Sequence, residues 1–318
     1  MEIRQLEAFA AVMSAGSVTG AARLLERSQP AVTRLVHELE AATGYPLFTR
    51  HGPRVAPTQE GFLLFEEVEH LLGGWRRLQA RAAEIAQGTG AAPLLLAATS
   101  AVALGLLPQA LRALEREAGP VPVRLTSGSP ERVLRDVAGG AVQLGASSLP
   151  LEHRGLQALW IGQAPCVAVL ADGDPLATAA CVPAAALAGR RIVTLSNPYR
   201  LRHRIDAALA PGGPAAPVIE TNSSANAQAL VRAGLGIAVL DPLTAHGAPL
   251  QGVQVRPLDV DIPFFFGVIA PQGRPLAPRL QALSDALREA ARALPGFAEH
   301  PPAAHAGLLQ AAAGLSSP

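Results

Sequence analysis

The sequence predicts an α/β protein whose N-terminal part is all-α and whose C-terminal part is a two-lobed, doubly wound α/β domain. The chain has 318 residues, a length that suggests about two domains. Apolar residues recur at helical spacing in the first part, whereas short apolar runs alternate with helical segments from residue 93 onward. Alternation of this kind is typical of a mostly parallel sheet with helices on both faces.

The first 58 residues read as three short helices followed by a hairpin. An opening helix over 3–13 and a second helix precede Glu26–Pro30, which supplies a turn and the start of a third helix. Ser28 or Gln29 can cap this third helix, and Pro30 suits its first turn, where a missing N–H costs nothing. Two helices that meet at such a turn form a helix-turn-helix, whose second helix can lie in a DNA major groove.

Polar side chains of the third helix have the chemistry to read bases. Gln29 can pair bidentately with adenine, Arg34 with guanine, and the methyl group of Thr33 can touch a thymine methyl. Residues 46–55 then read as a wing whose arginines face phosphates. The predicted DNA-contacting residues are Ser28, Gln29, Pro30, Thr33, Arg34, His37, Arg50 and Arg54. The alternative is a three-helix core domain whose polar face is merely solvated.

A long helix follows, from a cap at Thr58 to about Gln87. Its apolar residues follow one another at alternating steps of 4 and 3, namely Leu64, Val68, Leu71, Trp75, Leu78, Ala82 and Ile85. This spacing is that of a coiled-coil seam, whereas a helix packed on its own core usually shows a wider stripe. We therefore expect a linker and dimerisation helix, which would present two recognition helices to two DNA half-sites.

Short strands and helices alternate through the rest of the chain. Strands are expected at 94–98, 121–126, 142–146, 165–170, 190–195, 217–221, 236–240 and 263–270, and helices at 101–116, 130–138, 199–209, 224–233 and 275–293. The predicted divisions are a winged helix-turn-helix at 1–58, a linker helix and hinge at 59–92, a two-lobed domain at 93–294 and a flexible tail at 295–318. Within the two-lobed domain, lobe 1 should comprise about 93–162 and 268–294, and lobe 2 about 163–267.

Polar clusters follow the predicted strands, at the carboxyl ends where open α/β sheets bind ligands. Several of them open a helix, where free N–H groups and the helix dipole attract an anion. The predicted ligand-contacting residues are Thr99, Ser100, Ser127, Ser129, Ser147, Ser196 and Asn222. Any one cluster can be an ordinary helix cap, but five clusters in two lobes favour a cleft for a small carboxylate. Asp241, which ends the strand at 236–240, is placed to meet an amine.

Composition argues against most enzyme classes and against a cofactor. The chain has no lysine, and all 26 of its basic residues are arginine. A Walker A loop, a pyridoxal enzyme and a protein kinase each need a lysine. The sequence has no HExxH motif, no clustered His and Cys at metal-ligand spacing, and no GxSxG elbow. We therefore expect no catalytic activity, no metal site and no bound cofactor.

The sequence also predicts a cytoplasmic protein that does not enter a membrane. Its first residues are no signal peptide. Residues 85–111 are uncharged, but Pro93, Gly105 and Pro108 interrupt the run, which we read as a buried strand, a turn and a helix. Two cysteines, Cys166 and Cys181, suggest no disulfide scaffold.

The run SQPAVTRLVHELEAATGYPLFTR at residues 28–50, followed by PTQEG, resembles the N-terminal signature of LysR-type transcriptional regulators. The matching residues are Ala21, Ala22, Leu25, Ser28, Gln29, Pro30, Ala31, Leu39, Glu40, Gly44, Leu47, Phe48, Arg50, Thr58 and Gly61. The resemblance extends over roughly residues 2–294. It departs at Thr33, where the family usually has serine, although the hydroxyl is kept. The segments AATSAVALGLLP, SLPLEHRG and DPLTA look like the branch of the family that senses amino acids and opines.

The resemblance implies a ligand-responsive regulator with a periplasmic-binding-protein-like effector domain. It implies a homodimer that assembles into a homotetramer on double-stranded DNA, at an operator with an interrupted dyad, with RNA polymerase as a further candidate partner. Some LysR regulators sense oxidants, but neither cysteine has a basic neighbour that would favour a reactive thiolate. Two alternatives remain, a solute-binding protein of a transporter and a doubly wound enzyme. The absent signal peptide and the N-terminal helices argue against the first, and the absent lysine and phosphate loops argue against the second.

Overall fold

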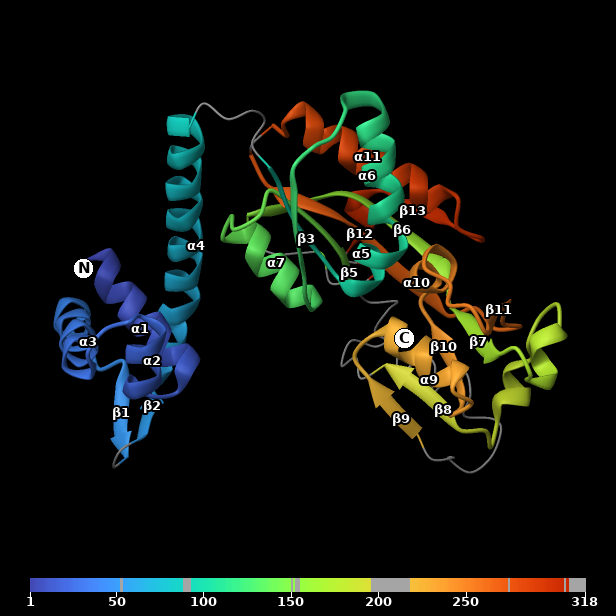
Figure 1. Ribbon diagram of the computed structural model, residues 1–318, viewed down its shortest axis with the longest axis horizontal. Coiled ribbons are helices and arrows are strands. Elements are labelled where there is room, and N and C mark those ends of the chain that lie inside the picture. Colours follow the sequence, from blue (N-terminus) through green and yellow to red (C-terminus); the bar gives the residue numbers. More distant parts are fainter. Residues whose placement is uncertain are drawn as a thin grey trace. The chain divides into compact units, whose positions relative to one another are not determined.

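The computed structural model describes residues 1–51, 54–87, 93–149, 151, 155–195, 218–273, 275–305 and 307–308. It comprises two compact units, one over Met1–Ala92 and one that begins at Pro93 (Figure 1). The first is a helical domain with a two-stranded hairpin, and the second holds two mixed sheets with helices around them. The predicted fold class is therefore confirmed.

The N-terminal unit has the predicted order of three helices, a hairpin and a long helix. Its elements are α1 Ile3–Ala15, α2 Val18–Leu24, α3 Gln29–Thr43, β1 Phe48–His51, β2 Arg54–Pro57 and α4 Gln59–Gln87. Thr58 caps α4 as predicted, since its Oγ1 accepts a hydrogen bond from the N–H of Gly61 at 2.9 Å. Ser28 occupies the N-cap of α3, but its hydroxyl makes no capping bond. Pro30, in the first turn, lacks one of the N–H groups that such a cap would bind.

The core of the N-terminal unit is centred on Phe9, which is fully buried. Its ring meets those of Phe48 and Phe65 edge to face, with centroids 5.5 and 6.2 Å away. Such aromatic pairs add to the free energy gained by burial alone. Phe48 belongs to the hairpin and Phe65 to α4, so one aromatic cluster fixes the hairpin and the long helix to α1.

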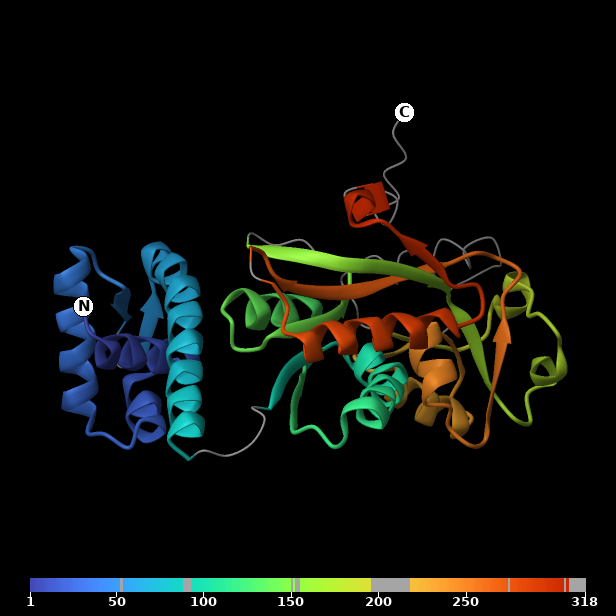
Figure 2. The same cartoon turned by 90° about the horizontal axis from the view of Figure 1, so that it is seen from above.

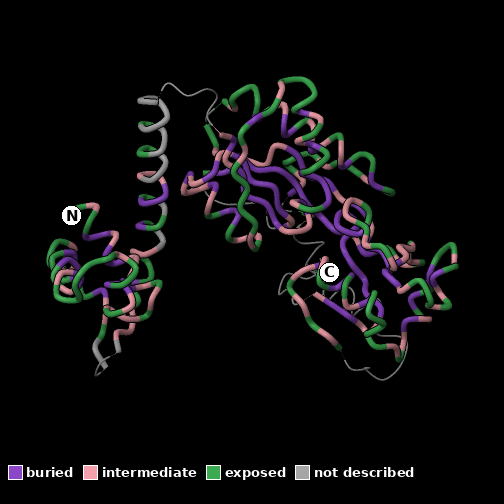
Figure 3. Tube along the Cα trace, viewed as in Figure 1, coloured by how far each residue is buried: buried purple, intermediate pink, exposed green. Residues whose placement is uncertain are grey.

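The packing of α4 differs from the predicted seam. Val68 is buried in the core of its own unit, so the expectation that it faces a partner helix is wrong, and Leu64 is half-buried against the same core. The reason is that the first turns of α4 complete the core around Phe9. Farther along, Leu71 and Leu78 are 48% and 60% exposed, and Figure 3 shows both buried and exposed stretches on α4. Only the later apolar positions are left to contact a second chain.

Two mixed sheets organise the C-terminal unit, a six-stranded sheet of order β13-β6-β12-β5-β3-β4 and a five-stranded sheet of order β11-β7-β10-β8-β9. Three neighbouring strands of each sheet are parallel, β4-β3-β5 and β9-β8-β10, and the other pairs are antiparallel. The strands are β3 Leu94–Ala98, β4 Val123–Ser127, β5 Leu144–Ser148, β6 Leu156–Pro165, β7 Val167–Ala171, β8 Ile192–Leu195, β9 Val218–Thr221, β10 Ile237–Leu240, β11 Val253–Pro257, β12 Pro263–Pro271 and β13 Ala298–His300. The helices are α5 Ser100–Gly105, α6 Leu107–Ala118, α7 Pro130–Ala138, α9 Ser224–Arg232, α10 Pro242–Gly247 and α11 Pro278–Arg292, with short 3-10 turns at Pro175–Thr178, Ala184–Leu187 and Pro302–Ala304.

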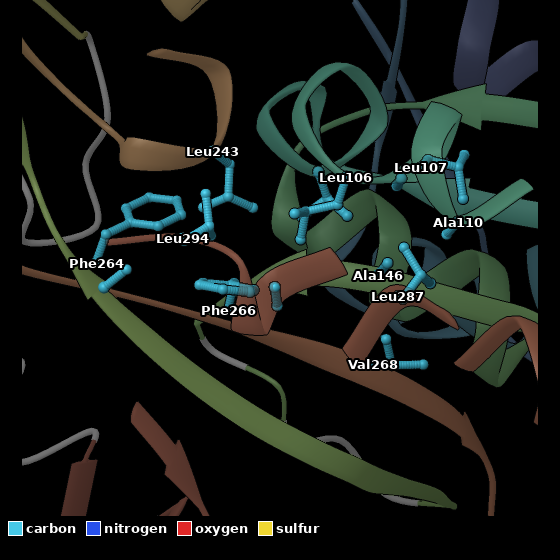
Figure 4. Close-up of a cluster of buried hydrophobic side chains, with 14 of the residues drawn as sticks. Leu106, Leu107, Ala110, Ala146, Leu243, Phe264, Phe266, Val268, Leu287 and Leu294 are labelled. Atoms are coloured by element: carbon cyan, nitrogen blue, oxygen red, sulfur yellow. The ribbon is translucent and has the colours of Figure 1, made fainter. Parts of the chain in front are cut away.

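Helices cover both faces of the six-stranded sheet. On one face α6 and α11 pack together over a core that contains Leu106, Phe266 and Leu287 (Figure 4). On the other face α7 packs through Val133 and Val137, which are fully buried (Figure 2). The first core continues into lobe 2 through Leu243 of α10, so the two lobes share one apolar cluster.

Several elements were not anticipated. The helix expected at 101–116 is two helices, α5 and α6, because Pro108 lacks the N–H that a continuous helix would need. The strands β6, β11 and β13 and the helix α10 were missed, and the helix expected at 199–209 lies outside the described residues. β6 and β12 stay in the six-stranded sheet up to Pro165 and from Pro263. The first crossing therefore comes a few residues after the expected lobe boundary, and the return comes a few residues before it.

The prediction of a flexible tail at 295–318 is wrong for its first part. β13 pairs with β6 at the edge of the six-stranded sheet, with Ala298 opposite Gln163. Glu299 is bound by Arg292 at 3.1 Å, and the buried His305 accepts a hydrogen bond through Nε2 from the N–H of Leu151 at 3.0 Å. Backbone pairing and these polar contacts give an ordered structure to a segment that was predicted from its composition to be flexible.

The lobes meet most closely where α5 crosses α10, and two glycines make this approach feasible. A Cβ on Gly105 would lie 2.3 Å from the carbonyl oxygen of Leu243, and one on Gly247 would lie 2.0 Å from the carbonyl oxygen of Gly105. Real side chains are not tolerated at such distances, so any other residue would push α5 and α10 apart.

Replacing Gly105 by alanine should therefore destabilise the C-terminal unit. Overpacking of a well-packed contact typically costs about 1–3 kcal/mol, and urea unfolding followed by circular dichroism would measure it. Gly173→Ala is the matched control, because a Cβ there has no heavy atom within 4 Å. A Gly105→Ala protein as stable as the control would show that the helices separate without cost.

Candidate functional site

The exposed face of α3 gathers most of the predicted DNA-contacting residues. One shallow depression is lined by Gln29, Pro30, Thr33, Arg34 and His37. They share a face because they recur at helical spacing, while Val32, Leu35, Val36 and Leu39 are buried on the opposite side. Ser28 is exposed at the helix N-terminus, next to this face.

The cation on this face is weakly held. The Arg34 side chain is 76% exposed, and its Nε lies 3.4 Å from Oε1 of Glu38, one helical turn away. Exposed ion pairs of this kind typically contribute at most about 1 kcal/mol, so little is lost when the guanidinium turns to another anion. Glu38 also accepts a hydrogen bond from Nε2 of Gln5 at 3.2 Å, which ties the carboxylate to α1.

Glu40 connects α3 to the hairpin, a role that the sequence did not reveal. Its Oε1 accepts hydrogen bonds from the N–H groups of Leu47 and Phe48, at 2.8 and 3.2 Å, and its Oε2 lies 3.1 Å from Nδ1 of His37. One carboxylate therefore orients the base of the hairpin and a side chain of the exposed face. Arg50 and Arg54 lie in paired strands, opposite Val55 and His51 respectively.

A second candidate site is a cavity of about 480 Å³ within the C-terminal unit, a volume typical of small-molecule sites. It is lined by Thr99, Ser100, Ala101, Ser127, Gly128, Ser129, Pro130, Glu131, Ser148, Leu195, Asn222, Ser223, Ser224, Asp241 and Phe264. Both lobes contribute, because the loops after β3, β4 and β5 and those after β9 and β10 converge there. The site is thus at the carboxyl ends of parallel strands in both sheets.

The cavity brings together five of the seven predicted ligand-contacting residues, Thr99, Ser100, Ser127, Ser129 and Asn222. Ser147 is fully buried and is not among the lining residues, so the structure does not bring it to this cavity. The neighbouring Ser148 lines the cavity instead, since consecutive residues of a strand point to opposite faces. Ser196 lies outside the described residues.

Two features of the lining were not predicted. Glu131, in the first turn of α7, adds a carboxylate to the wall. Thr99 is only 7% exposed, and its Oγ1 has no hydrogen-bond partner among the described residues. A buried hydroxyl left without a partner costs about 1–3 kcal/mol, so this atom marks a place where a bound polar group would be favourable.

Comparison with known proteins identifies the family of both units. A family model of bacterial regulatory helix-turn-helix proteins of the lysR family matches residues 3–62, and one of the LysR substrate binding domain matches residues 87–292. The chain belongs to the LysR family. It is a ligand-responsive, DNA-binding transcriptional regulator of that type, and the predicted family is confirmed.

Several named regulators resemble this LysR-family protein over nearly their whole length. NocR, a regulatory protein of Agrobacterium fabrum, is 32% identical over 296 residues, which cover 93% of this chain and 98% of NocR. The transcriptional activator LysR of Escherichia coli is 31% identical over 289 residues, covering 91% of this chain and 93% of the activator. OccR of Rhizobium meliloti, an octopine catabolism and uptake operon regulator, is 32% identical over 262 residues, covering 82% of this chain and 86% of OccR.

Solved structures share the fold at lower sequence identity. Full-length CbnR in a complex with its target DNA superimposes with a TM-score of 0.67 at 22% identity, covering 92% of this chain and all of that one. A full-length OxyR variant from Pseudomonas aeruginosa gives a TM-score of 0.61 at 21% identity, covering 95% of this chain and 99% of that one. Among the described residues of this LysR-family chain, no helix has the length and apolarity needed to cross a membrane.

Asp241 closes the lobe 2 side of the cavity and is 1% exposed. Its Oδ1 accepts from the N–H of Thr244 at 2.7 Å, and its Oδ2 accepts from Oγ of Ser224 at 2.5 Å and from Oγ1 of Thr244 at 3.3 Å. Burial raises the pKa of the Asp241 carboxyl above its ordinary value of 3.8, although these hydrogen bonds oppose the effect. The prediction that Asp241 meets an amine stays untested, and its main observed role is to cap α10 and hold Ser224.

The raised pKa of Asp241 predicts a pH dependence of stability. The folded state holds this proton more tightly than the unfolded state, so the contribution is complete below pH 3.8 and is lost as the pH rises through the folded pKa. In Asp241→Asn the amide does not ionise; its oxygen can still accept from the N–H of Thr244, and its NH2 group can donate to the hydroxyl oxygen of Ser224 in place of the bond that the carboxylate accepted. Its stability, measured by urea unfolding at a series of pH values, should therefore fall less steeply above pH 3.8 than that of the wild type. Asp261→Asn, at an exposed position, should keep the wild-type slope, and parallel profiles for Asp241→Asn would contradict the assignment.

Proposed function

We propose that this LysR-family regulator reads its operator through α3 and the hairpin, and senses a small amino-acid-like carboxylate in the cavity between its lobes. The observation that carries the DNA half is the single exposed face formed by Gln29, Pro30, Thr33, Arg34 and His37. It combines bidentate donors with a methyl group, which is the chemistry of major-groove readout. Residues 1–58 hold six arginines and five glutamates, so specific placement matters more than net charge.

Changing Arg34 to alanine should weaken operator binding by about 1–3 kcal/mol if the guanidinium is bidentate to guanine. It should also relax the preference at one position of each half-site, because base readout is lost there. Binding titrations against an operator and its single-base variants would measure both effects. Arg116→Ala, which removes the same charge from α6 of the C-terminal unit, is the control. A uniform loss across all sequences would assign Arg34 to phosphate contact.

The assembly that we propose is a homodimer that pairs into a homotetramer on an operator with an interrupted dyad, in the cytoplasm, with RNA polymerase as a further partner. The exposed Leu71 and Leu78 of α4 support a helix-to-helix contact, because an apolar seam in water is stabilised by burial. A dimer would raise the effective concentration of the second α3 at its half-site.

The ligand half of the proposal rests on the hydroxyls of the cavity. Thr99, Ser100, Ser129 and Asn222 supply donors, and α7 and α9 begin at the wall, where free N–H groups favour an anion. OccR is named for the regulation of octopine catabolism and uptake, and octopine is an amino-acid derivative, which supports the choice of an amino-acid-like carboxylate. Such a ligand would act by binding one arrangement of the lobes more tightly than another.

Replacing Ser100 by phenylalanine should abolish ligand binding, because the ring would occupy the cavity floor, while operator binding stays intact. The wild type would be screened against amino acids and organic acids by thermal shift, in which a ligand at about 100 times its Kd adds about 2.7 kcal/mol. Thr178→Phe, which adds the same ring at an exposed position of lobe 2, should respond like the wild type. Unchanged affinity in a folded Ser100→Phe protein, measured by calorimetry, would remove the ligand from this cavity.

A further inference from the structure

The exposed Arg34 of α3 stands at the end of a chain of polar contacts that begins on α1. The backbone N–H of Glu2 donates to Oε1 of Gln5 at 2.8 Å, and Nε2 of Gln5 donates to Oε2 of Glu38 at 3.2 Å. The other carboxylate oxygen of Glu38, Oε1, lies 3.4 Å from Nε of Arg34. The position of this guanidinium is thus connected to the start of the first helix.

Gln5 gives the chain of contacts a fixed origin. Only 8% of this polar residue is exposed, and the nearby Leu6 and Phe9 are buried in the core of the N-terminal unit. The amide has one oxygen and one NH2 group, and both are used, the first by Glu2 and the second by Glu38. A buried amide that is hydrogen-bonded at both ends has little freedom to turn, so Glu38 meets a donor at a defined place.

The contact with Glu38 divides the donors of Arg34. A guanidinium has five N–H donors in a planar fork, one on Nε and four on the two Nη atoms. Glu38 lies on the Nε side, so the Nη groups can pair with O6 and N7 of guanine. The pair is exposed and contributes little to stability, but a guanidinium held at one edge loses less freedom when it binds a base.

Glu38 also opposes a different use of Arg34. Non-specific binding to DNA comes from cations that neutralise phosphates, and a carboxylate beside the guanidinium repels a phosphate that approaches the same side. Residues 1–58 hold six arginines and five glutamates, so each carboxylate has a large effect on the net charge of this part. The carboxylate of Glu38 therefore favours contact with a base over contact with the backbone.

We propose that Glu38, oriented by Gln5, is a positioning residue that directs Arg34 to a base and away from phosphate, and so sets how well the regulator discriminates between DNA sequences. This inference rests on the proposed base readout by Arg34. It adds to that readout a residue that acts through Arg34 and determines its selectivity.

Glu38→Gln tests the positioning role in the full-length protein, because it keeps the size of the side chain and removes its charge. The probes are the duplex that the wild type selects from a randomised library, the single-base variants of that duplex, and a shuffled duplex of equal length. Selectivity, the ratio of affinities for the selected and variant duplexes, should fall about 2- to 5-fold at the position read by Arg34, the range in which exposed pairs couple. Affinity for the shuffled duplex should rise, with a steeper salt dependence from the added phosphate contact.

Two further variants separate positioning from charge. Gln5→Met removes the amide that holds Glu38 without changing the net charge, and it should lower selectivity at the same position. In an Arg34→Ala background, Glu38→Gln should leave selectivity unchanged, because Glu38 acts through Arg34. Glu7→Gln, which removes the same charge from α1, is the matched control and should keep the wild-type selectivity. Circular dichroism and thermal unfolding would establish that the variants fold.

The outcomes separate this inference from the readout on which it rests. If Arg34→Ala relaxes selectivity but Glu38→Gln keeps it, or if Glu38→Gln changes it equally with and without Arg34, then Glu38 does not position Arg34 and the readout still stands. A folded Gln5→Met protein with wild-type selectivity would likewise contradict the role of Gln5. If Arg34→Ala keeps the wild-type selectivity, Arg34 reads no base and both proposals fail.

Discussion

The C-terminal unit depends on one close contact, the crossing of α5 and α10 at Gly105 and Gly247. Backbone meets backbone there at distances that exclude any side chain. The same two helices begin at the cavity, since α5 starts at Ser100 and α10 is capped by Asp241. The contact therefore fixes the separation of two cavity walls that belong to different lobes. The apolar cluster that contains Leu243 is shared by both lobes and stabilises this arrangement.

In the N-terminal unit, too, contacts outside the candidate site position its residues. Two sets of contacts support the exposed polar face of α3. They are the aromatic cluster of Phe9, Phe48 and Phe65 and the hydrogen bonds of the Glu40 carboxylate. None of these belongs to the exposed face itself. In both units the residues proposed to contact a partner are mostly polar, and backbone packing or buried hydrogen bonds position them.

Features that follow from local sequence patterns were predicted well. Features that depend on contacts between residues far apart in the sequence were not. The helix-turn-helix, the Thr58 cap and the polar clusters after β3, β4 and β9 all follow from local spacing and capping chemistry. Ser148 and not the expected Ser147 lines the cavity, because the alternation of β5 fixes which serine faces the cavity only once its register is known. The spacing of Leu64 and Val68 fits a coiled-coil seam as well as it fits packing on the core of their own unit. Only the tertiary fold distinguishes these two arrangements. The hydrogen bonds that Glu40 makes to the hairpin have no local signature in the sequence.

The ordered C-terminal segment affects where the chain can be truncated to produce an isolated effector domain. The match to the LysR substrate binding domain stops at residue 292, yet β13 and His305 lie beyond it and cover the edge of β6. A fragment designed to that family boundary would expose a row of unpaired backbone groups on a long strand. Exposed edges of this kind recruit other chains. An isolated effector domain that ends at residue 292 would therefore tend to aggregate for a reason unrelated to its ligand or its DNA.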